Sequence, residues 1–89
     1  MKNQFEDYLI KQGYSVKTPS GNPSTVYDYI KRIDKICKSE KLTWSELADK
    51  IHTIVTQYDI GGSKEDLGRQ SHNAVINALK RFEDFVKTK

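Results

Sequence analysis

Basic side chains gather in one stretch of the chain, residues 22–39, where they could bind phosphate. The stretch reads NPSTVYDYIKRIDKICKS. If it forms a helix, its cations fall on the side opposite its apolar residues, because successive residues turn by about 100°. We name this side the basic strip, and it consists of Lys31, Arg32, Lys35 and Lys38. Lys and Arg pair with the phosphates of nucleic acids, so the strip is either a surface that binds a polyanion or an ordinary solvated face.

Residue types that support catalysis are present, but their spacing does not bring them together. His52 and His72 lie in different predicted elements and offer no recognisable spacing for a metal site or a catalytic base. The acidic pairs at residues 6–7 and 65–66 are adjacent in sequence, so their side chains point apart and are expected to be solvated. Residues 61–64, GGSK, lack the glycine spacing and the preceding strand of a phosphate-binding loop. We therefore expect no enzyme activity, no metal or other cofactor and no small-molecule substrate.

Length and composition indicate one small domain that spans residues 1–89. The chain has 15 basic and 12 acidic residues and a formal net charge of +3, which favours anionic partners only weakly. No apolar run is long enough to span a bilayer, and the first residues lack the apolar stretch of a secretory signal, so we expect a cytoplasmic protein without a membrane partner. The single cysteine, Cys37, lies among apolar positions and is predicted to be a buried, inert thiol.

The first half of the chain predicts two amphipathic helices. Residues 2–12 form a short one that Gly13 can end in a left-handed conformation. Residues 22–39 form a long one, which starts with Asn22 or Ser24 as the cap. Its apolar positions recur at steps of three and four and predict a core face: Val26, Tyr29, Ile30, Ile33, Ile36 and Cys37.

The second half predicts two more helices and one loop. Thr43 and Glu46 have the spacing of a capping box, which starts a helix that runs to Tyr58. Residues 61–70 contain three glycines and predict the main loop, and Ser71 can cap the last helix. The expected fold is all-α, a small bundle of four or five helices. The last helix and the helix of residues 22–39 should form the central pair around these core positions: Ile33, Ile51, Leu79 and Phe82.

Two stretches have patterns that occur together in one known family. Residues 24–30, STVYDYI, place small polar residues before a tyrosine-rich helix start. Residues 68–86, GRQSHNAVINALKRFEDFV, place a polar start before a pattern of small, Leu, basic and Phe residues. With residues 5–9, FEDYL, which are similar to the family's first helix, nearly the whole chain resembles the N-terminal core-binding, SAM-like domain of tyrosine recombinases and phage integrases.

The resemblance implies a fold and a function. In that family the domain is a bundle of four or five short helices that clamps one side of duplex DNA. The family's catalytic half has no counterpart after Lys89, so we expect no recombinase activity in this chain. It is either an excised domain of a longer integrase or a free-standing protein that keeps the fold for binding DNA. By position, the resemblance nominates these DNA-binding residues: Ser24, Thr25, Lys31, Arg69, His72, Asn73, Asn77 and Lys80. The basic strip adds Lys35 to this set. We expect two groups, Lys31 and Lys35 on the helix of residues 22–39 and Arg69 and His72 at the start of the last helix, to line a single concave face.

A second interpretation is that the chain is a protein-interaction module, such as a small accessory or inhibitor protein of a mobile element. It rests on the near balance of charge and on three aromatic residues that could be exposed, Tyr14, Tyr27 and Tyr58. Three acidic residues, Asp28, Asp34 and Asp84, also interrupt the proposed DNA-facing surfaces. Binding of duplex DNA at low salt would separate the two interpretations.

Overall fold

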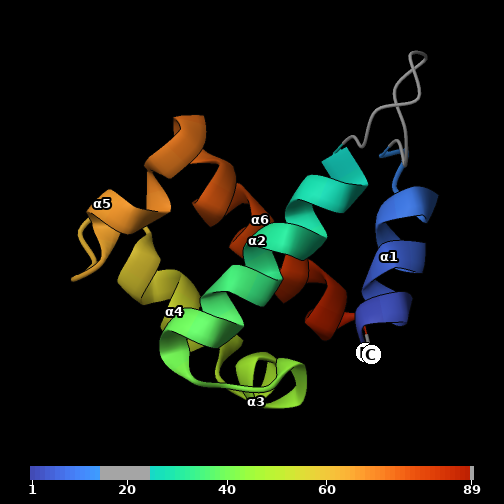
Figure 1. Cartoon of the computed structure of the whole chain (residues 1–89), viewed down its shortest axis with the longest axis horizontal. Coiled ribbons are helices and arrows are strands. Elements are labelled where there is room, and N and C mark those ends of the chain that lie inside the picture. Colours follow the sequence, from blue (N-terminus) through green and yellow to red (C-terminus); the bar gives the residue numbers. More distant parts are fainter. Residues whose placement is uncertain (15–24, 89) are drawn as a thin grey trace.

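The computed structural model describes residues 1–14 and 25–88, with the side chains of residues 71 and 72 left out. Within these ranges the chain contains six helices and no strand, so the all-α prediction is confirmed and the expected number of four or five helices is wrong. The helices appear in this order in Figure 1: α1 (Lys2–Lys11), α2 (Thr25–Glu40), α3 (Trp44–Asp49), α4 (Ile51–Tyr58), α5 (Glu65–Gly68) and α6 (Gln70–Lys87).

Helices α2 and α6 cross at the centre of the molecule and share the most extensive contact between any two helices, as predicted (Figure 1). Ile33 of α2 and Leu79 of α6 are completely buried. Each helix buries one stripe because its apolar residues recur with the helical period. The predicted central pair is therefore confirmed, and so are the four central core positions, Ile33, Ile51, Leu79 and Phe82, all of which are buried.

An aromatic cluster joins α1 to this pair. Phe5 is completely buried, and its ring centroid lies 5.1 Å from that of Phe82 in an edge-to-face arrangement. The same ring lies 5.4 Å from Phe85 and 6.0 Å from the half-buried Trp44. Aromatic rings bury a large area each, so the short helix α1 supplies a central part of the core. The last residue of α1 is Lys11, one residue earlier than predicted, and Gly13 follows the cap with a φ of +95°, the left-handed conformation that was expected to end this helix.

The helix expected over residues 43–58 is divided at Lys50. Its start is as predicted: Thr43 Oγ1 accepts from the Glu46 amide at 3.1 Å, and Glu46 Oε1 accepts from the Thr43 amide at 3.0 Å. Lys50 has φ −107° and ψ 10°, which ends α3. The break leaves few backbone groups unpaired, because the Lys50 amide still donates to Glu46 and its carbonyl accepts from Ile54. No glycine or proline marks it, so apolar periodicity alone predicts one helix.

The expected loop, residues 61–70, contains α5 and packs closely against the end of α4. A Cβ on Gly68 would lie 2.0 Å from the Tyr58 carbonyl oxygen, and one on Gly62 would lie 2.2 Å from the Gln57 carbonyl oxygen. Such distances are shorter than any real contact, so both positions require glycine. The last helix also begins two residues earlier than predicted, because its cap is Arg69 rather than Ser71 and its first residue is Gln70.

Tyr58 connects this corner to the end of α2. Its hydroxyl donates to Glu40 Oε1 at 2.8 Å, and the same carboxylate oxygen accepts from the Lys64 ammonium. Burial, and then the Glu40 carboxylate, raises the pKa of Tyr58, whereas the hydrogen bond from Lys64 lowers the pKa of Glu40. Tyr58 is only 2% exposed, so it cannot be one of the exposed aromatic residues of an interaction surface.

Candidate nucleic-acid interface

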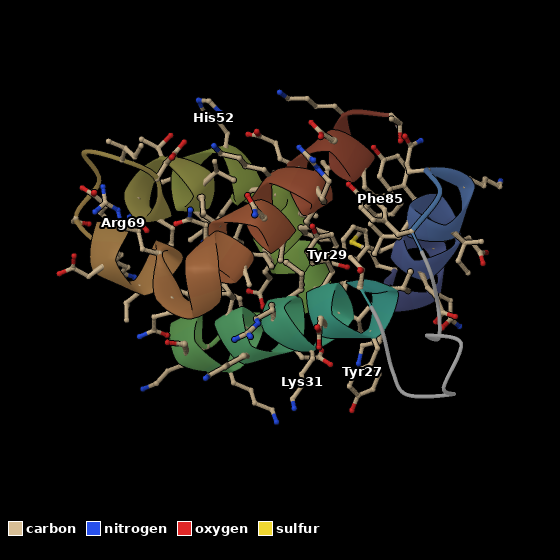
Figure 2. The ribbon with its side chains drawn as sticks, turned by 90° about the horizontal axis from the view of Figure 1, so that it is seen from above. Tyr27, Tyr29, Lys31, His52, Arg69 and Phe85 are labelled. Carbon is tan, nitrogen blue, oxygen red and sulfur yellow. The ribbon has the colours of Figure 1, made fainter. Side chains whose placement is uncertain are left out.

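The basic strip lies along the exposed side of α2. Lys31, Lys35 and Lys38 are exposed, and Arg32 is half-buried. Figure 2 shows Lys31 and Tyr27 pointing outward from the helix, away from the core. Within residues 1–14 and 25–88, no carboxylate forms an ion pair with any of these four cations. The charge of Lys38 contributes to lowering the pKa of Asp34 without forming an ion pair, whereas Lys31 and Lys35 are free to pair with an external anion.

The acidic residues near the strip differ in what they contact. Asp34 accepts hydrogen bonds from Lys2 and Trp44, so it belongs to the contact between helices. Asp84 pairs with Arg81 at 3.2 Å. Asp28 is exposed in the first turn of α2, three residues before Lys31, and is the acidic residue that remains at the end of the strip.

The start of α2 holds two of the predicted contacts. Thr25 is its first residue and is exposed. Ser24 lies outside the described residues. The positive end of a helix dipole favours a phosphate near its first turn, but the carboxylate of Asp28 lies in this same turn.

Four predicted residues come together at a hollow of about 220 Å³ beside the start of α6. Three of them, Asn73, Asn77 and Lys80, are spaced by four and three residues and so share one side of the helix. We name this the α6 hollow, and its lining is Tyr58, Asp59, Ile60, Glu65, Arg69, Asn73, Ile76, Asn77 and Lys80. The side chain of His72 is not described. The resemblance thus nominated residues that do share one surface.

Carboxylates already pair with both cations of the α6 hollow. Arg69 Nη2 lies 2.6 Å from Glu65 Oε2, and Lys80 Nζ lies 3.4 Å from Asp59 Oδ2. A phosphate would therefore have to compete with these two acidic residues. In this respect the hollow differs from the basic strip, whose cations have no such partner among the described residues.

Asn73 has a backbone role that sequence reasoning did not find. Its φ is +69°, in the left-handed region, and Figure 1 shows the ribbon of α6 bending after its first turn. Asn is one of the few residues other than Gly that adopt this conformation readily. The conformation redirects the chain from the α5 corner into the long part of α6, and it gives a structural reason for Asn at this position.

Residues of the two predicted groups line different hollows. Arg69 lines the α6 hollow, whereas Lys35 lines a smaller one between α2 and the corner formed by α5 and α6. Figure 2 shows Arg69 beside α5 and Lys31 at the far edge of α2. The single concave face stays a prediction, and these two hollows are treated as separate surfaces.

The sequence did not predict a cluster near the start of α2 that contains Tyr14, Tyr29 and Arg81. The ring centroids of Tyr14 and Tyr29 lie 5.5 Å apart. A hydrogen bond with Tyr14 is the main cause that raises the pKa of Arg81. Figure 2 shows Tyr29 pointing inward between α2 and α6. Tyr14 is half-buried in this cluster, so only Tyr27 of the three expected aromatic residues is exposed, at 51%. No short-range spacing in the sequence links residues so far apart.

Neither a cluster of metal-binding side chains nor a membrane-spanning helix occurs among the described residues. These residues contain no group of three or more His, Cys, Asp or Glu side chains that could hold a metal ion. None of the helices in residues 1–14 and 25–88 is long and apolar enough to cross a membrane. Comparison with protein-family models, with curated proteins and with solved structures finds no match to this chain.

Proposed function

We propose that the chain binds duplex DNA, with the basic strip of α2 on the phosphate backbone. The observation that carries the proposal is that Lys31, Lys35 and Lys38 are exposed on one side of a helix without a carboxylate partner among the described residues. Each Lys that neutralises a phosphate releases a condensed counterion, which favours binding. Helix α2 is held rigidly by its buried face, so the three ammonium groups are presented together.

The α6 hollow has a secondary role in this proposal. The side-chain amides of Asn73 and Asn77 can pair with the edge of an adenine, which would give preference among sequences. Arg69 and Lys80 would contribute to affinity only by exchanging Glu65 and Asp59 for phosphate. The proposal includes three further DNA contacts at the starts of α2 and α6, made by Ser24, Thr25 and His72.

The proposal extends to the arrangement of the helices and to the place where the domain acts. The helices would be arranged as in the core-binding domain of tyrosine recombinases, and the domain would act in the cytoplasm. The role of the chain would be to hold DNA rather than to catalyse a reaction on it.

The test is a titration of a fluorescently labelled duplex at two salt concentrations, followed by anisotropy. With three phosphate contacts, affinity should fall roughly fortyfold between about 50 mM and about 200 mM salt, because the slope of the logarithmic plot is about −0.9 per contact. No binding at the lower salt concentration would contradict the proposal. An affinity that does not change with salt would contradict the assignment to lysine–phosphate contacts.

A further inference from the structure

A second surface on the molecule combines apolar walls with a basic edge. It is a groove of about 80 Å³ between α2 and the corner of α5 and α6, and we name it the α5 groove. Its apolar walls are Ile36, Leu67 and Val75, and the ring of Tyr58 lies among them. Ile36, Val75 and Tyr58 are at least 93% buried, whereas Leu67 is 43% exposed beside them. An exposed Leu next to an apolar hollow is a site where another apolar group can be buried favourably.

The charge at the edge of the α5 groove has one sign. Arg32 and Lys35 of α2 line it, together with the uncharged Ser39 and Gln70. No carboxylate lines it, in contrast to the α6 hollow, where Asp59 and Glu65 pair with the cations. A partner that enters this groove therefore meets an apolar floor and two positive charges on one side.

We infer that the α5 groove docks an acidic amphipathic segment of a protein partner. One aliphatic side chain of the segment inserts against Ile36, Leu67 and Val75, and neighbouring Asp or Glu side chains pair with Arg32 and Lys35. The groove is small, about 80 Å³, so the segment inserts a single side chain rather than a larger apolar group. Opposite charge on the two partners speeds encounter and fixes the register of the segment.

This inference goes beyond the proposed DNA binding and does not depend on it. A phosphate backbone has no apolar group to place against Leu67, so duplex DNA would leave the groove floor uncovered. The two ligands nevertheless share Lys35, which lies both on the basic strip and at the edge of the α5 groove. An acidic segment in the groove should therefore weaken DNA binding.

The test follows the amide NMR signals of the isotope-labelled chain while a synthetic acidic peptide with one central Leu is added. Two control peptides separate the two parts of the inference: in one the Leu is replaced by Ser, and in the other every Asp and Glu is replaced by Asn or Gln. The expected result is saturable shifts at Ile36, Leu67 and Val75 with the first peptide, and at least about tenfold weaker binding of each control.

Variants of the chain provide a second readout. Leu67→Ser should weaken the acidic peptide about tenfold or more, because it removes one apolar wall. Ile60→Ser is the matched control: Ile60 is 79% exposed and lies outside the groove, so peptide affinity should stay unchanged. Lys35→Gln removes one charge at an exposed position and should also weaken the peptide without disturbing the core. Amide spectra without peptide report whether each variant is folded.

Four results would overturn the inference. These are the absence of shifts with the acidic peptide, equal binding of either control peptide, shifts located outside the α5 groove, and shifts at the groove that depend on chain concentration without any peptide. The last result would mean that a second copy of the chain occupies the groove. A chain that binds the peptide but not DNA would support this inference and contradict the proposed function, so the two can fail separately.

Discussion

The indole Nε1 of Trp44 donates a hydrogen bond of 2.7 Å to the carboxylate of Asp34. The same carboxylate accepts from the Lys2 ammonium at 2.9 Å, so one acidic side chain of α2 connects α1 and α3. Partial burial raises the pKa of Asp34, but the hydrogen bonds from Lys2 and Trp44 outweigh this effect, and the pKa lies below its ordinary value. Asp34 therefore acts in folding, although the sequence suggested an acidic interruption of a DNA-facing surface.

The free energy of unfolding should fall when the pH drops below about 4. The pKa of Asp34 is lower in the folded chain than in the unfolded chain, so its contribution is present above the unfolded pKa and is lost as the pH falls through the folded pKa. Glu40 acts in the same direction, because Lys64 lowers its pKa. The measurement is urea unfolding at about pH 7 and at about pH 3.

The variant Asp34→Asn should lose part of this pH dependence, since its amide oxygen can still accept from Trp44 but does not titrate. The matched control is Asp28→Asn, which removes an exposed carboxylate of the same helix that has no ion pair among the described residues. The control should keep the steep fall at low pH. If the free energy of unfolding of both variants falls at low pH as steeply as that of the wild type, the role assigned to Asp34 is wrong.

Truncation of Phe82 to Ala should lower the free energy of unfolding by about 3–5 kcal/mol. Phe82 is completely buried and contacts both Phe5, at 5.1 Å, and Trp44, at 5.5 Å between ring centroids. Tyr27→Ala removes an aromatic ring that is 51% exposed and should change the stability by about 0.5 kcal/mol or less. Urea unfolding measures both, and a loss under about 1 kcal/mol for Phe82→Ala would contradict its place at the centre of the core.

Substitution by Ala and by Gly should have opposite effects on stability at the two asparagines of the α6 hollow. Asn73 has a φ of +69°, so Asn73→Ala should cost about 1–2 kcal/mol and Asn73→Gly should be tolerated. Asn77 is an exposed residue of the same helix and is not among the residues with positive φ. Asn77→Gly should therefore cost about 1 kcal/mol, and Asn77→Ala should cost nothing or stabilise slightly. Thermal unfolding of the four variants tests this, and the same order at both positions would contradict the backbone role of Asn73.

The helices that the sequence predicted well are those with a local signal. The capping box of Thr43 and Glu46 marks the start of α3, and Gly13 marks the end of α1. The break at Lys50 has no such signal, since no glycine or proline lies there. The glycines of residues 61–70 were interpreted as loop residues, but Gly62 and Gly68 are required by the close approach of α5 to α4. A sequence alone does not distinguish these two uses of glycine.

Helical spacing predicted the basic strip, and the family resemblance nominated the residues of the α6 hollow, but neither could predict how the two surfaces are related. The residues of the basic strip share one side of α2 because they are one helical turn apart, and the same holds for Asn73, Asn77 and Lys80 on α6. The ion pair between Lys80 and Asp59 joins α6 to the end of α4, so it depends on packing and no short-range pattern reports it. The pair between Arg69 and Glu65 has the local i,i+4 spacing and could have been predicted from the sequence.

Replacement of Lys31 and Lys35 by Ala should weaken DNA binding to a similar degree for every sequence tested. The two ammonium groups are one turn apart on the exposed side of α2 and have no carboxylate partner among the described residues. Each lost phosphate contact should make the salt slope shallower by about 1 unit. Asn77→Ala, in contrast, should change the preference between sequences if its amide pairs with an adenine edge.

The matched control for the double variant is Lys11→Ala with Lys50→Ala, which removes the same charge from exposed positions outside α2. Affinity and salt slope should then stay close to those of the wild type, since net charge alone is not the cause of binding. Both double variants should unfold near the wild-type temperature, because exposed charges contribute little to folding. If the folded Lys31 and Lys35 variant binds DNA as tightly as the wild type, the basic strip is an ordinary solvated face, and the protein-interaction interpretation of the chain is favoured.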